Sequence, residues 1–225
     1  MIIYTNQIIK KTMLFLPLLA LFACSPKTTE ILSKVNDVAQ IETVTIGSQV
    51  WTVSNLNVST YRNGDKIPQV QNGDVWKTLT TGAWCYYNND ASNGILYGKL
   101  YNWYAVNDPR GLAPNGYHIP TDAEWKKLSD YINSQGKPGQ IGTKMKSASG
   151  WNENGFGTNS SGFTGLPGGY RNKYGVIFED EGKTGNWWSS SEAMSCQLAH
   201  YNDQLKMFSL YNRFSTGLSV RCIKD

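Results

Sequence analysis

Apolar and polar residues alternate in short blocks along much of the chain, a pattern typical of short strands joined by turns. One block runs from Val44 to Val58 and is interrupted at Gly47-Ser48, so it predicts two strands joined by a turn. Late in the chain, four further blocks predict short strands at residues 186–191, 197–201, 206–210 and 218–223.

Two segments show helical spacing instead. From Tyr97 to Val106 the apolar residues fall on one face of a helix, which Asp108-Pro109 would end. A second helix is predicted to begin after Thr121, because Thr121 and Glu124 form a capping box in which each side chain can bond to the backbone amide of the other. Its buried stripe consists of Trp125, Leu128 and Ile132, and Gly136 ends it.

The remaining segments are expected to be loops. The chain from Gly139 to Tyr170 is rich in glycine and mostly loop, and a loop region of this length inside a domain is often functional. Charged residues make up only 17% of the chain and aromatic residues 12%. This composition excludes a disordered chain, which needs high charge and few aromatic residues, and a coiled coil, which needs many Ala, Glu, Lys, Leu and Arg residues.

The first 23 residues have the form of a bacterial export signal. They contain two lysines and no acidic residue, and their apolar run from Met13 to Ala23 is too short to span a hydrocarbon core of ~30 Å. The run leads into Leu-Phe-Ala-Cys, which resembles a lipobox, so we expect residues 1–23 to be removed and Cys24 to carry the lipid. An ordinary signal peptide or an uncleaved anchor, with Cys24 incidental, is the alternative.

Residues 24–40 are polar and predict a tether that leads to a domain at residues 41–225. A lipid at Cys24 would attach the protein to a membrane. Ser25, directly after the lipidated cysteine, favours transfer of the protein to the outer membrane, where we expect the domain to be periplasmic or surface-exposed. Removing residues 1–23 lowers the net charge from +4 to +2, because two lysines leave with no acidic residue. The basic residues that remain are scattered, so we expect no nucleic-acid partner.

The domain contains three cysteines, and export favours disulfides. We expect a disulfide between Cys85 and Cys222, with Cys196–Cys222 or three free thiols as alternatives. No CxxC motif occurs, and His118 and His200 are isolated from each other. The sequence therefore predicts no metal site and no cofactor.

Nine motifs occur in a fixed order and together carry a family resemblance: Ile46–Trp51, Asn55–Val58, Trp84–Asp90, Tyr97–Val106, Gly116–Trp125, Gly142–Lys146, Gly165–Arg171, Trp187–Glu192 and Ser219–Cys222. They resemble the Fibrobacter succinogenes major paralogous domain (FISUMP) over residues 41–225. The resemblance implies an α+β domain with a C-type-lectin-like fold of two helices, short antiparallel strands and long loops. It also implies a relationship to formylglycine-generating-enzyme-like domains, but it supplies no activity.

Enzymatic function has little support in these residues. The formylglycine-generating enzymes use a pair of cysteines that bind copper, and here only Cys196 lies in that neighbourhood. No G-x-S-x-G motif of a serine hydrolase occurs, and the acidic run at residues 179–181 is interpreted as a solvated turn rather than as glycosidase carboxylates or a cation site. The calcium-lectin triplets E-P-N, Q-P-D and W-N-D are also missing from the sequence.

A calcium-independent binding surface fits the composition best, because aromatic rings stack on sugar faces while polar side chains provide adaptable hydrogen bonds. We expect a non-enzymatic module that binds a glycan or protein ligand through its late loops, and alternatives are an enzyme of the related superfamily or a diversified ligand-display protein. A plain polar face around core aromatic residues would have the same composition. The candidate ligand-binding residues are His200, Tyr201, Asn202, Lys206, Phe208, Tyr211, Asn212, Arg213 and Phe214.

Two arginines are expected to be structural. Arg171 and Arg221 lie in motifs of low charge, so we expect them to bond with backbone or carboxylate groups inside the fold. Most tryptophans are also expected to be structural. Trp187 and Trp188 point to opposite faces of their predicted strand, so at least one of them should be buried.

Overall fold

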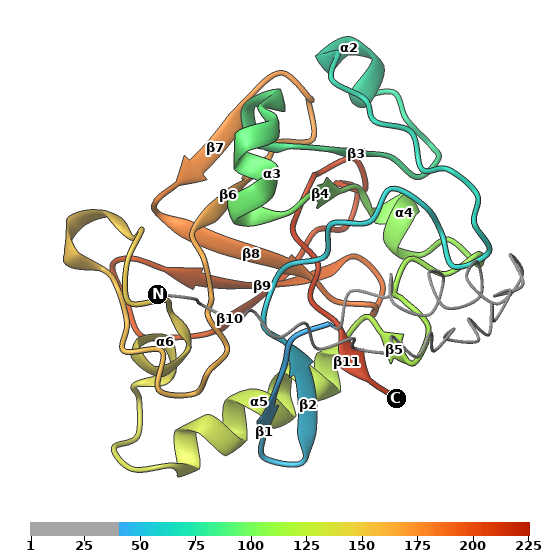
Figure 1. Cartoon of the computed structure of the whole chain (residues 1–225). Coiled ribbons are helices and arrows are strands. Elements are labelled where there is room, and N and C mark those ends of the chain that lie inside the picture. The colour runs from blue at the N-terminus through green and yellow to red at the C-terminus, as the bar shows by residue number, and fades with distance from the viewer. Residues whose placement is uncertain (1–40) are drawn as a thin grey trace, which may run out of the picture. The chain divides into compact units, whose positions relative to one another are not determined.

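The first and last strands of the domain lie in one sheet. β1 (Thr43–Ile46) and β2 (Gln49–Thr52) form a hairpin, and β11 (Ile223–Lys224) pairs with both β2 and β5 (Tyr117–His118), giving the antiparallel order β1-β2-β11-β5 (Figure 1). The hairpin confirms the two early strands. This computed structural model describes residues 41–225, and the predicted signal peptide, lipidated cysteine and tether lie outside them.

A five-stranded sheet carries the late part of the chain (Figure 1). Its neighbours are antiparallel except for the parallel pair β6 and β8. The predicted strands at 186–191, 197–201 and 206–210 are confirmed, although the first two begin earlier than expected. Of the strand predicted at 218–223, only the last residue belongs to a strand, β11. In spatial order the strands are β10 (Lys206–Ser209), β9 (Met194–Ala199), β8 (Thr184–Trp188), β6 (Gly168–Arg171) and β7 (Phe178–Glu181).

The predicted helix from Tyr97 to Val106 is wrong. That stretch contains the end of α3 (Ala91–Tyr97), strand β4 (Leu100–Tyr101) and the short α4 (Trp103–Val106). Gly98 ends α3 with a φ of +72°, and a Cβ there would lie 2.8 Å from the Leu56 carbonyl oxygen. Asn102 then starts a new helix by accepting the Ala105 amide.

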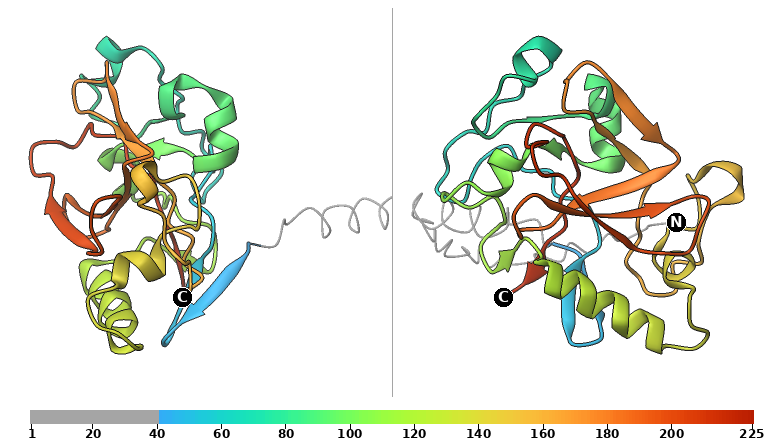
Figure 2. Two further views of the ribbon diagram at one scale, coloured as in Figure 1. Left: turned by 90° about the vertical axis from the view of Figure 1, so that its left-hand side faces the viewer. Right: turned by 180° about the vertical axis from the view of Figure 1, so that it is seen from behind.

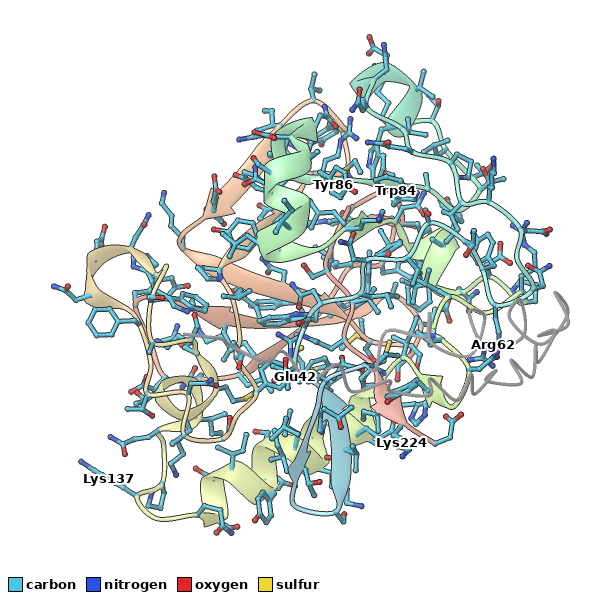
Figure 3. The ribbon with its side chains drawn as sticks, in the orientation of Figure 1. Glu42, Arg62, Trp84, Tyr86, Lys137 and Lys224 are labelled. Carbon is cyan, nitrogen blue, oxygen red and sulfur yellow. The ribbon has the colours of Figure 1, made fainter. Side chains whose placement is uncertain are left out.

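Strand β4 pairs with β3 (Trp84–Cys85), and the 3₁₀ turn η1 (Tyr87–Asn89) follows β3. Lys99 is almost fully buried here, and its Nζ lies 4.4 Å from the Trp84 ring centroid and 5.2 Å from that of Tyr86 (both rings are labelled in Figure 3). The ammonium also donates to the Asn57 carbonyl and Asn57 Oδ1, so its charge is compensated by oxygen atoms and rings.

The second predicted helix is confirmed as α5 (Asp122–Ser134). Thr121 Oγ1 accepts the Glu124 amide and Glu124 accepts the Thr121 amide, as the capping box requires, and the helix ends before Gly136. Its apolar stripe is buried. The following region is mostly loop, as expected, and contains α6 (Ile141–Met145) and the 3₁₀ turn η2 (Asn152–Asn154), while α2 (Gly73–Trp76) lies earlier in the chain.

The core is aromatic and lies on both faces of β8. Trp187 packs with Trp125 and Phe163, whereas Trp188 packs with Trp103 on the other face, and both strand tryptophans are fully buried. Figure 2 shows the helix α3 on one side of the five-stranded sheet. Because both faces are covered, alternation along β8 places each ring in a separate cluster.

The predicted disulfide between Cys85 and Cys222 is wrong, because the three cysteines within residues 41–225 are free and buried. Each one lies in a different hydrophobic cluster: Cys85 with Trp76, Cys196 with Trp187, and Cys222 with Trp188. Burial raises the pKa of Cys85 to about 11 and that of Cys222 to about 12. These thiols therefore act as small apolar core residues.

Candidate functional site

A groove of about 420 Å³ lies over the five-stranded sheet, and its lining includes the β6–β7 turn and the segment after β10. Its floor follows from strand alternation. Along β9, Cys196 and Leu198 are packed in the core, so their neighbours point to the other face. The floor residues from β6, β8 and β9 are Tyr170, Asn186, Ser195 and Gln197.

Amide groups on the floor are held in place by their own hydrogen bonds. Gln197 Nε2 donates to Asn186 Oδ1 at 2.9 Å, and Asn186 Nδ2 donates to Thr184 Oγ1 at 2.8 Å and to the Gly169 carbonyl at 3.3 Å. The chain of bonds fixes the orientation of both amides. The floor is therefore a preorganised polar surface.

One wall contains a carboxylate whose two oxygens are both engaged. Tyr170 Oη donates to Glu179 Oε2 at 2.7 Å, and Asn172 Nδ2 donates to Glu179 Oε1 at 2.9 Å. Burial first, and then the bond to Glu179, raise the pKa of Tyr170, so the phenol keeps its proton. Our interpretation of residues 179–181 as a solvated turn is wrong, because Glu179 and Asp180 are half-buried in β7.

The walls also carry exposed rings and cations. Tyr174 is 60% exposed and Phe208 is 41% exposed, on opposite walls of the groove. Lys173 Nζ lies 5.1 Å from the Tyr174 ring centroid, and Arg213 lies on the wall of Phe208. Within residues 41–225, the ion pairs of the structure involve neither of these two cations.

The sequence of this domain matches a known family. A family model described as the Fibrobacter succinogenes major domain covers residues 44–224. The chain belongs to this family. Its FISUMP domain therefore includes every residue of the groove, and the expected resemblance is confirmed. No curated protein and no solved structure matches the chain, so the α+β class rests on the structure itself and the C-type-lectin-like architecture stays a prediction.

The nine candidate residues do not form one site in the FISUMP domain. Only Phe208 and Arg213 line the groove. Tyr211 and Asn212 lie exposed in the following turn, where Asn212 has a φ of +62°, and Phe214 packs beside Tyr104. Lys206 is half-buried and pairs with Gln197 at the start of β10, while His200, Tyr201 and Asn202 lie at the other end of the β9–β10 hairpin.

That other end is fixed to the scaffold by a buried lysine. Lys146 is 3% exposed, and its Nζ donates to the carbonyls of Ala199 and Asn202 at 3.2 and 3.1 Å. Burial lowers the pKa of Lys146. Thr143 Oγ1 also donates to Asp203 Oδ1 at 2.7 Å. These bonds make the turn a structural element rather than a free loop.

Sequence reasoning missed the floor residues Asn186, Ser195 and Gln197 of β8 and β9, and it also missed the groove residues of β6, β7 and their turn. Those of β6, β7 and their turn are Tyr170, Asn172, Lys173, Tyr174, Glu179 and Asp180. Tyr170 belongs to the Gly165–Arg171 motif that contributed to the family resemblance, but nothing local assigned its side chain to a groove. The apolar residue Phe178 directly before the acidic Glu179 was the sequence signal that could have predicted strand β7 here.

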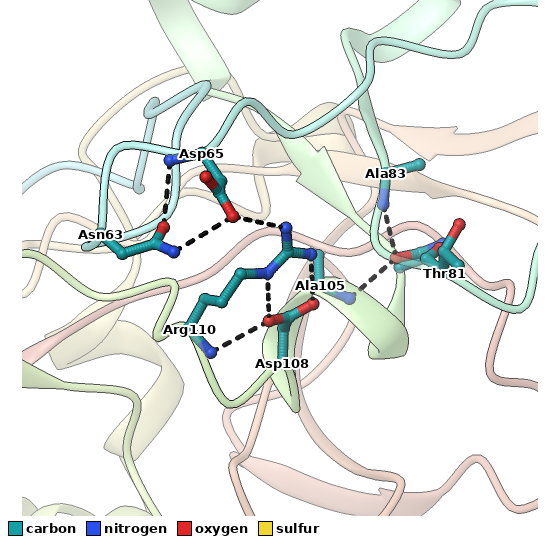
Figure 4. A network of polar contacts seen from close by, with 8 residues as sticks. Asn63, Asp65, Thr81, Ala83, Ala105, Asp108 and Arg110 are labelled. Carbon is teal, nitrogen blue, oxygen red and sulfur yellow. Dashed lines mark hydrogen bonds and ion pairs between the residues drawn. The ribbon is translucent and has the colours of Figure 1, made fainter.

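A second pocket of about 310 Å³ lies beside α4. One side carries a salt-bridge network in which Arg110 makes a bidentate contact with Asp108 at 2.8 Å and a third contact with Asp65 at 3.0 Å (Figure 4). The Arg110 hydrogen bonds are the main reason that the pKa of Asp108 falls to about 2. The other side carries the rings of Trp103, Tyr104 and Phe214.

Residues 41–225 contain no group of His, Cys, Asp and Glu side chains arranged to hold a metal ion. In the same range, no helix combines the length and the apolar character needed to cross a membrane.

Proposed function

We propose that this FISUMP domain is a non-enzymatic binding module that holds a glycan in the groove over the five-stranded sheet. The observation that carries the proposal is the combination of exposed rings on opposite walls, Tyr174 and Phe208, with the floor amide of Gln197, which its bond to Asn186 holds in one orientation. Rings provide flat apolar contact area for a sugar face, and amides bond its hydroxyl groups.

The groove also differs from the sites that the enzyme alternative requires. Glu179 accepts a hydrogen bond on each oxygen, from Tyr170 and from Asn172, so its carboxylate is held in place by two neighbours inside the fold. Cys196 points into the core on the opposite face of β9 from the groove, so it cannot contribute to a copper-binding pair there. These contacts support binding over turnover.

The predicted lipid at Cys24 would place this module on the outer membrane, where a glycan-binding domain can act in adhesion or capture. Incorporation of labelled palmitate into the full chain, with Cys24→Ser as the control, tests the anchor. Label in the wild-type chain alone supports lipidation at Cys24. Equal label in both chains, or none in either, contradicts it.

Binding is tested with the purified full chain on an array of neutral and acidic glycans. Phe208→Ala should weaken binding to the glycans that wild type retains by about tenfold, equivalent to about 1.4 kcal/mol. Tyr201→Ala is the matched control, because Tyr201 is an exposed ring at the opposite end of the hairpin, 68% exposed. If wild type retains no glycan, or if both variants bind equally, the proposed site is wrong. Binding to a protein partner alone would favour a protein ligand.

A further inference from the structure

The groove and the second pocket adjoin one and the same loop. Arg213 lines the groove, and Phe214, the next residue, lines the second pocket. The loop runs from the end of β10 to Thr216, and the Arg213 amide donates to the Leu210 carbonyl at 2.7 Å while the Thr216 amide donates to the Arg213 carbonyl at 2.8 Å. A ligand that leaves the groove across this loop therefore meets the second pocket.

Aromatic rings continue along that path. The Tyr211 ring is 66% exposed and lies 6.2 Å from the Phe214 ring, which in turn lies 6.0 Å from the Tyr104 ring. Tyr211 lines neither pocket, so its exposed ring lies on the loop between them. Aromatic rings therefore lie in the groove (Phe208), on the loop (Tyr211) and in the second pocket (Tyr104).

The second pocket has the same chemical character as the groove. Aromatic residues form one side of it, and the polar side chains of Thr80, Thr81 and Asn107 also contribute to its lining. The backbone beneath it is fixed, because the Trp103 amide donates to the Phe214 carbonyl at 2.9 Å. Rings beside hydroxyl and amide groups suit a further sugar unit.

Formal charges cancel in both pockets. In the groove, Lys173 and Arg213 are balanced by Glu179 and Asp180. In the second pocket, Arg110 is paired with Asp108 among the lining residues. Neither pocket has a surplus of cations to attract a uronate or sulfate group.

We infer that the ligand is a neutral oligosaccharide long enough to occupy the groove and the second pocket together, crossing the loop over Tyr211. This inference rests on the proposed glycan binding and adds the length and the charge class of the ligand. Occupying two linked sites makes the second contact intramolecular, which raises affinity for a long chain without changing affinity for a short one.

Calorimetry with the purified full chain tests the inference, using disaccharides and hexasaccharides of the neutral cello-, manno- and xylo-series and a galacturonate hexasaccharide. In at least one neutral series, the hexasaccharide should bind about tenfold or more tightly than the disaccharide. Tyr104→Ala and Asn107→Ala, both in the second pocket, should remove most of that gain and leave disaccharide binding unchanged. Tyr201→Ala is the control and should preserve the gain.

Each other result has a distinct meaning. Equal affinity for short and long chains, or equal weakening of both by the second-pocket variants, overturns the spanning ligand and leaves the proposed function standing. Tighter binding of the galacturonate hexasaccharide than of every neutral one overturns the neutral class. If no saccharide binds the wild-type chain while its circular dichroism shows a folded protein, the proposed function fails as well.

Discussion

The interior of the domain and its groove both contain arginine, but the hydrogen bonds of the two arginines differ. Arg221 is completely buried, lies 4.6 Å from the Phe163 ring centroid, and donates to Asn55 Oδ1 and to the carbonyls of Thr52 and Phe163 at 2.7–2.8 Å. In the groove, Arg213 is exposed and has no ion pair within residues 41–225.

Arg171 repeats the interior pattern. Its guanidinium stacks 4.3 Å from the Trp76 centroid and donates to the carbonyls of Val70, Gln71 and Gly175. These bonds confirm that both motif arginines bond inside the fold. Neither faces a carboxylate, and burial lowers the pKa of Arg221 to about 9. Saturated donors therefore mark arginines that hold loops together, and unpaired exposed donors mark those available to a ligand.

The largest expected effect is a loss of stability when the interior arginine Arg221 is replaced. Arg221→Met would remove the guanidinium donor from the buried carbonyls of Thr52 and Phe163, and would leave Asn55 Oδ1 with the Trp187 indole N–H as its remaining donor. We expect the free energy of unfolding to fall by about 3–5 kcal/mol, the cost typical of an uncompensated buried polar group or charge. Urea denaturation followed by tryptophan fluorescence measures the loss.

Arg213→Met is the matched control for that experiment, since it removes the same group from the exposed loop. Its free energy of unfolding should stay within about 0.5 kcal/mol of wild type. Comparable destabilisation by the two variants would mean that the loop after β10 depends on its arginine as the interior does, and the comparison would fail.

The next largest expected effect is a loss of ligand affinity when the groove arginine Arg213 is replaced. Arg213→Met should weaken binding of the tightest neutral oligosaccharide by about tenfold, because a hydrogen bond to a charged donor contributes about 1.5–3 kcal/mol. Calorimetry measures the affinity, and Lys206→Met is a control because Lys206 lies in the same hairpin outside the groove lining. Unchanged affinity in Arg213→Met would remove this arginine from the site.

Sequence patterns predicted those elements of the fold that are determined by residues close together in the chain. The capping box of α5 is complete within four residues, and the turn at Gly47-Ser48 needs only its own backbone, so both were predictable. The false helix at Tyr97–Val106 had the right spacing of apolar residues. It is broken by contacts from far away in the sequence, since Asn102 also accepts the Ala83 amide and donates to the Thr81 carbonyl.

The groove was only partly predictable for the same reason. Phe208 and Arg213 stand in a conspicuous polar and aromatic segment, whereas Tyr170 and Glu179 meet only because β6 pairs with β7, with Tyr170 opposite Glu179 in the register. The cysteines could not be assigned from spacing, because burial in three separate clusters depends on the whole topology. Pairing of distant strands is the information that single-sequence patterns lack.

The smallest effect is expected at His118, which is intermediate between the two regions in exposure. Its Nε2 lies 2.8 Å from Glu124 Oε1 and its Nδ1 lies 2.8 Å from Asp225 Oδ1, so only the imidazolium can donate to both carboxylates. Partial burial opposes the charged form, but the bonds to Glu124 and Asp225 outweigh it and raise the pKa of His118.

Because the folded pKa of His118 lies above the unfolded value of about 6.5, its contribution to the free energy of unfolding is complete below that value and is lost as the pH rises through the folded pKa. The side chain is 38% exposed, so screening limits the contribution to about 0.2–1 kcal/mol. Urea denaturation at a series of pH values from below 6.5 to above the folded pKa of His118 should show the free energy of unfolding of wild type falling as the pH rises. The same plot for His118→Gln should be flatter. An identical slope in the variant would assign the pH dependence to other groups, and β11 would then be held by backbone pairing and core contacts alone.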